Sequence, residues 1–164
     1  MHTRDKPLGP TCFIFRDPRD VFLSMWHWRG GRFSIDQIVK LCDTDSRYKR
    51  FIHTWWNTGK AEAQTSYEEL ITEPILALER VTNTLTGQTF SRAEISAAIH
   101  RQEFTKVKAA HPELAHHMWT GKIGIWRNHY SRSDAELVQN LFGGLMMEQG
   151  YITGPEWVRE CKQQ

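Results

Sequence analysis

The pattern of apolar and polar positions predicts one short buried strand near the start of the chain, followed by helices. Residues 11–15, TCFIF, form an apolar run rich in β-formers, which is typical of a strand buried on both faces of a parallel sheet. Asp17 and Pro18 then form a helix-start signal, because aspartate caps helices and proline is favoured in the first turn. The apolar face expected for this helix comprises Val21, Met25 and Trp28, with Phe22 and Trp26 beside them.

Later segments predict a second strand and further helices. Residues 46–58 place aromatic and aliphatic side chains at helical spacing, with Gly59 as the expected stop. Residues 62–68, EAQTSYE, predict the second strand, although they are less apolar. A helix then opens at Pro74 and is expected to end at Gly87.

Two capping boxes predict the last helices. Ser91 with Glu94 starts one, and Ser133 with Glu136 starts another that carries one apolar stripe and stops near Gly150. The order strand, helix, helix, strand, helix predicts an α/β unit with crossovers rather than a helical bundle.

The composition is that of an ordinary globular protein and excludes several functions. The 164 residues are 40% hydrophobic and 24% charged, which excludes a disordered or collagen-like chain. The net charge of +2 gives no general basis for binding nucleic acid or membranes, and no apolar run could cross a bilayer. Any anion site must therefore be local.

The cysteines and the first residues indicate a reducing, cytoplasmic location. Cys12, Cys42 and Cys161 lie far apart without a C-x-x-C pair, so neither a disulfide framework nor a cysteine–zinc site is expected. The opening MHTRDKPLGP is polar and unlike a secretory signal. Histidines such as His116 and His117 lack metal-ligand spacing, so no metal is expected.

The segment 13–28, FIFRDPRDVFLSMWHW, is the strongest candidate for an anion site. Arg16 ends the first strand at the sheet edge where α/β proteins bind ligands, and a helix N-terminus follows at once. A guanidinium there can hold two phosphate oxygens, and Ser24 can add a hydroxyl donor. The alternative is an ordinary helix start, in which Asp17 is a cap and Asp20 pairs with Arg16 or Arg19.

This segment resembles a nucleotide-binding segment of the sulfotransferases that use 3′-phosphoadenosine 5′-phosphosulfate. FRDPRDVFLS is similar to the family's strand ending in Arg, then Asn/Asp-Pro-Arg/Lys-Asp, then a Ser one turn further on. The resemblance implies that Arg16 and Ser24 bind the 3′-phosphate of this co-substrate. It also implies that Trp28, in the following MWHW, lines the acceptor side.

Two further segments resemble the same family in the same order. Tyr67-Glu68-Glu69-Leu70 is similar to a Tyr-Glu-Asp-Leu motif whose tyrosine lies near the adenine, so the resemblance places Tyr67 there. Residues 121–130, GKIGIWRNHY, are similar to the family's C-terminal phosphate loop, which implies that Gly121 and Lys122 bind the nucleotide. The alternatives are that Tyr67 is only a buried strand residue and Lys122 only a surface charge.

The chain also departs from the family pattern. Trp119 and Thr120 stand where relatives usually have Arg-Lys, and Ile125 replaces an Asp. No G-x-x-x-x-G-K-[ST] phosphate loop occurs in the 164 residues. The resemblance therefore implies a P-loop-NTPase-like parallel sheet flanked by helices, predominantly helical by residue count and truncated at the N-terminus. Residues 1–164 are expected to form one partial domain whose open sheet edge favours self-association.

Three functions follow from these observations as alternatives. The first is an enzyme, or part of one, that transfers a sulfuryl group from 3′-phosphoadenosine 5′-phosphosulfate to a hydroxyl or amine of a small-molecule acceptor. His2 is then the candidate general base, unless it belongs to a frayed terminus. The second is an inactive remnant that binds adenosine 3′,5′-bisphosphate or a protein partner. An unrelated α/β protein is the third, and the three ordered segments argue against it.

Overall fold

The computed structural model describes residues 9–44, 47–56, 58–114 and 119–162. Its residues cluster into two compact units. The sheet unit comprises the described residues of Met1–Arg16 and Arg50–Pro112, and the helical unit those of Asp17–Lys49 and Glu113–Gln164. The chain therefore leaves the sheet unit between Arg16 and Asp17, inside the segment that carries the anion-site motif.

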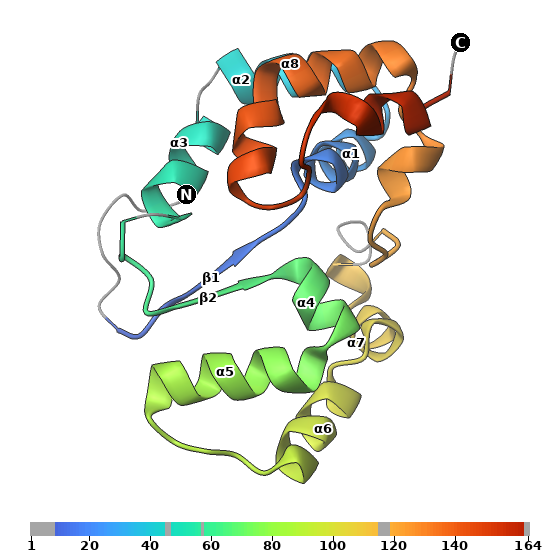
Figure 1. Cartoon of the computed structure of the whole chain (residues 1–164). Helices are drawn as coiled ribbons and strands as arrows, with labels where there is room; N and C mark the ends of the chain where they lie inside the picture. Colours follow the sequence, from blue (N-terminus) through green and yellow to red (C-terminus); the bar gives the residue numbers. More distant parts are fainter. Residues whose placement is uncertain (1–8, 45–46, 57, 115–118, 163–164) are drawn as a thin grey trace. The chain divides into compact units, whose positions relative to one another are not determined.

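The two predicted strands are present in the sheet unit and pair in parallel. They are β1 (Cys12–Phe15) and β2 (Ala63–Ser66), which run side by side in Figure 1. The expectation that the first strand is buried on both faces is wrong, because Phe13 is 4% exposed whereas its neighbour Ile14 is 54% exposed. Side chains alternate across a strand, so one face of β1 is covered and the other is open.

Aromatic side chains of α3 (Arg47–Trp56) cover the buried face of β1. The ring of Phe51 meets that of Phe13 edge to face at 5.7 Å, and the ring of Trp56 meets that of Phe15 at 4.4 Å. The side-chain amide of Gln64 on β2 donates a hydrogen bond to the carbonyl oxygen of Trp56. The helix predicted for residues 46–58 is thus confirmed and supplies the aromatic layer of the sheet unit.

Four further α-helices complete the sheet unit among its described residues. They are α4 (Tyr67–Thr72), α5 (Pro74–Thr86), α6 (Arg92–Arg101) and α7 (Phe104–Ala110), and the 3₁₀ turn η1 (Pro112–Leu114) follows them. The predicted capping box of Ser91 and Glu94 starts α6. Gly87 ends α5 at a φ of 68°, a left-handed conformation that glycine adopts without steric cost. Ala77 and Val81 of α5 are buried, and α5 packs on both β2 and α6.

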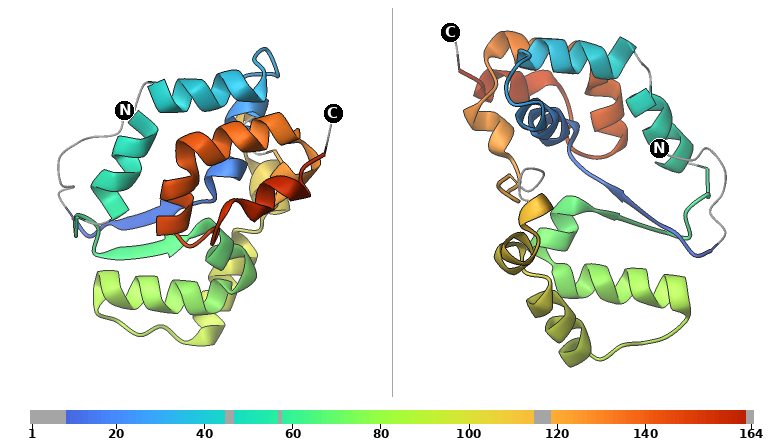
Figure 2. Two further views of the ribbon diagram at one scale, coloured as in Figure 1. Left: turned by 45° about the horizontal axis from the view of Figure 1, so that its top comes forward. Right: turned by 180° about the vertical axis from the view of Figure 1, so that it is seen from behind.

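The helical unit contains α1 (Pro18–Trp28), α2 (Ile35–Thr44), α8 (Arg132–Glu148) and the 3₁₀ helices η2 (Ile125–Asn128) and η3 (Pro155–Glu160). Sequence analysis did not predict α2, which packs against α1 and lies beside α8 (Figure 2). Asp17 caps α1 as predicted, accepting a hydrogen bond from the backbone N–H of Arg19. The predicted apolar face is wrong, since Phe22 and Leu23 are fully buried whereas Trp28 is 53% exposed.

The capping box predicted for α8 lies two residues too late in the chain. Ser131, not Ser133, caps the helix, and its partner is Asp134 rather than Glu136. Ser131 has the extended backbone that a cap requires, and Ser133 already belongs to the first turn. The predicted apolar stripe is confirmed in part, because Val138, Phe142, Leu145 and Met146 are buried and Leu137 and Leu141 are half-buried.

Candidate functional site

Arg16 and Tyr67 meet at the carboxyl edge of the two parallel strands. Phe15 lies opposite Ser66 in the strand register, and the next residue on each strand is Arg16 and Tyr67 respectively. The guanidinium carbon of Arg16 lies 4.3 Å from the centre of the Tyr67 ring, which is a cation–π contact. These are the two predicted site residues that the structure brings together. Tyr67 is the half-buried first residue of α4, so the alternative of a buried strand residue is wrong.

A hydrogen-bond network fixes the first turn of α4, which carries Tyr67. Ser66 and Glu69 form a capping box. The Glu69 carboxylate also accepts hydrogen bonds from the Thr65 hydroxyl (2.9 Å) and the Arg80 guanidinium (2.7 Å). Burial by itself would raise the pKa of Glu69, but the hydrogen bonds from Ser66, Thr65 and Arg80 outweigh it and hold that pKa below the usual value. The ionised carboxylate is therefore the form that stabilises this turn.

Glu69→Gln is expected to destabilise the chain at neutral pH and to have a smaller effect in acid. A carboxylate with a lowered pKa contributes stability above its unfolded-state pKa, and this contribution is lost as the pH falls through the folded-state pKa. Because the side chain is about half exposed, we expect a cost of only about 0.5 kcal/mol at pH 7. Urea unfolding of both proteins from pH 7 down to pH 3 measures the difference. A gap that widens in acid would contradict this assignment.

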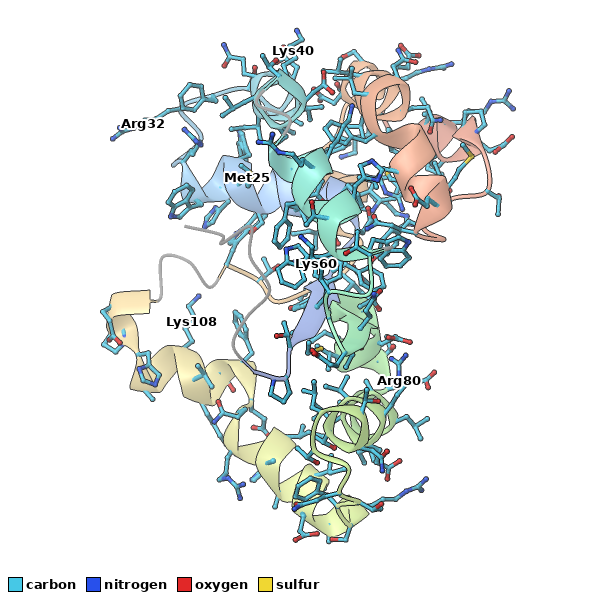
Figure 3. All side chains as sticks on the ribbon, turned by 90° about the vertical axis from the view of Figure 1, so that its left-hand side faces the viewer. Met25, Arg32, Lys40, Lys60, Arg80 and Lys108 are labelled. Atoms are coloured by element: carbon cyan, nitrogen blue, oxygen red, sulfur yellow. The ribbon has the colours of Figure 1, made fainter. Side chains whose placement is uncertain are left out.

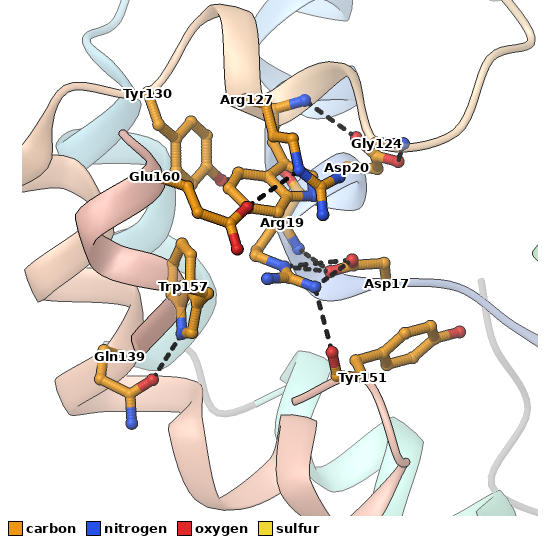
Figure 4. A network of polar contacts seen from close by, with 11 residues as sticks. Asp17, Arg19, Asp20, Gly124, Arg127, Tyr130, Gln139, Tyr151, Trp157 and Glu160 are labelled. Atoms are coloured by element: carbon orange, nitrogen blue, oxygen red, sulfur yellow. Dashed lines mark hydrogen bonds and ion pairs between the residues drawn. The ribbon is translucent and has the colours of Figure 1, made fainter. Parts of the chain in front are cut away.

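In the helical unit, the Arg19 side chain is buried against a carboxylate and two aromatic rings (Figure 4). Its guanidinium donates hydrogen bonds from Nε and Nη2 to the Asp17 carboxylate, at distances of 2.7 to 3.1 Å. Its guanidinium carbon lies 4.1 Å from the ring centre of Trp126 and 4.8 Å from that of Trp157. Nη2 also donates to the carbonyl oxygen of Tyr151 at 3.4 Å. The second arginine of the R-D-P-R-D motif is therefore a structural cation.

Asp20 is fully buried and anchors the loop that was predicted to bind phosphate. Its carboxylate accepts hydrogen bonds from the backbone N–H of Gly124 (2.6 Å) and of Trp126 (3.2 Å), as Figure 4 shows for Gly124. The alternative, in which Asp20 serves only as an ion-pair partner for arginine, does not account for these two backbone hydrogen bonds. Within the motif, Asp17 and Arg19 form an ion pair. Charge-assisted bonds of this kind are among the stronger ones in a protein interior.

Tyr130 ties the other end of the same loop to α1. Its hydroxyl donates a hydrogen bond of 2.9 Å to the carbonyl oxygen of Arg19. Burial, reinforced by the negative charge of Asp17, raises the pKa of the Tyr130 phenol well above its usual value. The phenol therefore stays protonated and remains a donor at every physiological pH.

Gly121 and Lys122 lie in the part of this loop that precedes η2. Gly121 has a φ of 65°, and the Lys122 side chain is exposed. The backbone N–H of Lys122 donates to the hydroxyl of Thr120 at 3.2 Å. Gly124 has a φ of 70°, and a Cβ there would come within 2.7 Å of the Arg127 side chain, so the turn requires glycine. The loop is thus held in one tight conformation.

Trp119 stands where the family usually carries a basic residue, and it packs against histidine. Its ring stacks on that of His27 at 4.4 Å with an interplanar angle of 10°, and meets the ring of His129 edge to face at 5.4 Å. His27 lies on α1 and His129 follows η2. Aromatic packing therefore holds Trp119 within the helical unit.

The remaining predicted residues are placed separately. Ser24 lies two turns into α1 and is half-buried. Trp28 is the last residue of α1, with 53% of its surface exposed. His2, the candidate base, lies outside the described residues. Ser24, Trp28, Gly121 and Lys122 belong to the helical unit, whereas Arg16 and Tyr67 belong to the sheet unit.

Sequence analysis missed the structural roles of Arg19 and Asp20. A signal was present, since both charged residues fall on the same face of the helix as Phe22 and Leu23, which are buried. Charged residues are almost never fully buried unless they are paired. The spacing therefore favoured burial of both charges, which the alternative of an ion pair between Asp20 and Arg16 or Arg19 did not include.

The structure also bears on metal binding, membrane insertion and disulfide formation. Within the described ranges, no three His, Cys, Asp or Glu side chains gather closely enough to hold a metal ion. No described helix is both long enough and apolar enough to cross a membrane. All three cysteines are unpaired thiols, and burial raises the pKa of Cys12 and of Cys161.

Comparison with known families identifies the class of protein. The chain matches the sulfotransferase domain over residues 12–150, which is most of its length, and it therefore belongs to that family. The resemblance derived from the three sequence segments is thereby confirmed. A comparison with curated proteins found no match.

Solved structures confirm the fold. One match is retinol dehydratase in complex with androsterone and the inactive cofactor PAP. The TM-score is 0.69 at 15% sequence identity, and the match covers 84% of this chain and 47% of the other. The chain thus spans about half the length of the chain in that structure. The expected α/β class, with a small parallel sheet and mostly helical content, is confirmed.

Proposed function

We propose that this chain binds the adenosine 3′,5′-bisphosphate part of 3′-phosphoadenosine 5′-phosphosulfate and takes part in sulfuryl transfer to a hydroxyl or amine of a small-molecule acceptor. The observation that carries the proposal is the sulfotransferase domain match over residues 12–150. The contact of Arg16 with Tyr67 supports it, since a cation and an aromatic ring lie together at the carboxyl edge of parallel strands. Retinol dehydratase, which shares the fold, was solved with PAP.

Each residue has a role in this proposal. Arg16 neutralises the 3′-phosphate, with Ser24 as a hydroxyl donor, and Tyr67 offers its ring to the adenine. Gly121 and Lys122 contribute a backbone N–H and a charge from the loop that Asp20 anchors. Sulfuryl transfer, like phosphoryl transfer, depends mainly on positioning and on stabilising developing negative charge.

A general base completes the proposed reaction by taking the proton of the acceptor. His2 remains our proposal for this role. The proposal includes a cytoplasmic location, which the three unpaired cysteines support, because such thiols persist in a reducing compartment.

One observation favours the second candidate function, an inactive protein that binds adenosine 3′,5′-bisphosphate. Trp119 and Thr120 occupy the places of two phosphate-binding cations, and Trp119 is engaged with His27. Transfer of labelled sulfate from 3′-phosphoadenosine 5′-phosphosulfate to a neutral and to an anionic ring acceptor, 2-naphthol and 6-hydroxy-2-naphthoate, separates the two functions. Binding with transfer supports the enzyme, and binding without transfer supports the alternative.

Arg16→Ala is expected to weaken the binding of adenosine 3′,5′-bisphosphate at least about tenfold, because it removes a charge-assisted contact to phosphate. Isothermal titration calorimetry measures the affinity, which we expect to fall as salt is raised. Arg92→Ala is the matched control, since Arg92 is an exposed arginine of the same unit that pairs with Glu79. Equal affinities for Arg16→Ala and the unmodified chain would refute the role of Arg16. No heat up to millimolar nucleotide would refute the proposed function.

A further inference from the structure

A hollow of about 370 Å³ lies where α1 ends in the helical unit. It is lined by Trp28, Arg29, Gly30, Arg32 and Phe33. All five residues belong to the end of α1 or to the short connection to α2. In Figure 3 the Arg32 side chain points away from the ribbon of this connection. Four of the lining residues, Trp28, Gly30, Arg32 and Phe33, are exposed, so the hollow lies at the surface.

The two aromatic side chains of the hollow are exposed, and the Arg29 guanidinium lies near both. Trp28 is 53% exposed and Phe33 is 42% exposed. The guanidinium carbon of Arg29 lies 5.8 Å from the Trp28 ring centre and 5.5 Å from the Phe33 ring centre. The exposed parts of the two rings offer apolar contact area to the ring of a ligand.

The charge of the hollow is not balanced by nearby acids. Among the residues that the structure describes, neither Arg29 nor Arg32 forms an ion pair, and the buried Nε of Arg29 has no hydrogen-bond partner. The nearest acid along the chain, Asp36, pairs with Lys40 at 3.1 Å and accepts a hydrogen bond from Ser34. Two guanidinium groups are thus available for an anion, and arginine binds carboxylate and sulfate through two parallel donors.

We propose that this hollow binds a ring-bearing anion, with the ring against Trp28 and Phe33 and a carboxylate or sulfate group on Arg29 and Arg32. The inference rests on the proposed function and extends it by naming the acceptor class. The acceptor carries a ring and a negative charge in addition to the hydroxyl or amine that receives the sulfuryl group. A small inorganic anion would leave the rings unused, and a neutral ring compound would leave the two arginines unused.

Three probes with the same ring test this proposal: 2-naphthoate, naphthalene-2-sulfonate and neutral 2-naphthol. We expect the two anions to bind about tenfold more tightly than 2-naphthol at low salt, given two partly exposed ion contacts. Calorimetry of the full chain without nucleotide measures all three affinities. The preference should shrink as salt rises. Equal affinity for 2-naphthol and both anions would overturn the proposal, and a preference for one anion identifies the group that the arginines select.

Variants assign the effect to the hollow. In the double variant Arg29→Gln with Arg32→Gln, the anions should bind no more tightly than 2-naphthol, whereas Trp28→Ala should weaken all three probes. The matched control is Arg132→Gln, an exposed arginine of the same unit, which should change nothing. A preference that survives the double variant would overturn the proposal. If that variant fails to fold by circular dichroism, the exposed single change Arg32→Gln decides the question by whether the preference falls.

A parallel measurement of adenosine 3′,5′-bisphosphate binding distinguishes failure of this proposal from failure of the proposed function. Loss of adenosine 3′,5′-bisphosphate binding with retained anion preference would refute the proposed function and leave the hollow as an anion site. Retained nucleotide binding with no anion preference would refute the hollow alone. Competition between 2-naphthoate and the nucleotide would show that both probes use one site, which contradicts a separate acceptor site.

Discussion

Asp20→Ala is expected to lower the free energy of unfolding by about 3 kcal/mol, because it removes two hydrogen bonds to a buried carboxylate and leaves their donors unpaired. The donors are the backbone N–H groups of Gly124 and Trp126, and Trp126 is fully buried. Urea unfolding followed by tryptophan fluorescence measures the loss. Hydrogen exchange gives a local readout, since the amides of Gly124 and Trp126 should lose protection more than those of α8.

Two variants control the Asp20 experiment. Asp20→Asn keeps one oxygen acceptor and should cost less than Asp20→Ala. Asp36→Ala removes an exposed carboxylate of the same unit and should cost less than about 1 kcal/mol. If Asp20→Ala and Asp36→Ala were equally mild, Asp20 would not be the anchor of the loop.

Arg19→Ala is expected to be at least as damaging, with a loss of about 3–5 kcal/mol, because it removes the guanidinium that pairs with the buried carboxylate of Asp17. The ion pair is almost completely shielded from solvent, with side-chain exposures of 5% for Arg19 and 9% for Asp17. The substitution also removes the cation from between the rings of Trp126 and Trp157. Chemical unfolding measures the loss, and Arg19→Lys is expected to fall between the alanine variant and the unmodified chain because lysine lacks the planar fork.

A paired substitution distinguishes the charge from the packing. The double variant Asp17→Asn with Arg19→Met removes both charges and keeps a side chain of similar length between the tryptophans. It should be more stable than Arg19→Ala alone, since no uncompensated charge remains buried. A double variant that unfolds as readily as Arg19→Ala would show that packing, rather than the ion pair, causes the loss.

Together these contacts give three of the four charged residues of R-D-P-R-D a structural role. Of the residues in R-D-P-R-D, Asp17, Arg19 and Asp20 are buried within the helical unit. They fix the start of α1 and the loop before η2. Preorganisation of this kind lowers the cost of ordering groups around a bound anion.

Much of the local structure could be predicted because its signals are short-range. The N-cap Asp17, the capping box of Ser91 and Glu94, and the stop at Gly87 all follow from side chains that bond within one helical turn. The capping box of α8 was misplaced because Ser131 and Ser133 offer the same chemistry two residues apart. The backbone conformation at Ser131, together with its bonds to Asp134, decides between them.

The sequence by itself determined the family, through three ordered segments. It also determined the order and approximate ends of most helices and of both strands, because periodicity and capping depend on residues close together in the chain. Only the tertiary structure decided that Asp20 holds a loop more than a hundred residues away, that Trp119 stacks on His27, and that one face of β1 is open. Those contacts depend on which distant backbone donors, rings and helices lie near a given side chain in the folded protein. The spacing of residues along the chain does not determine these long-range neighbours.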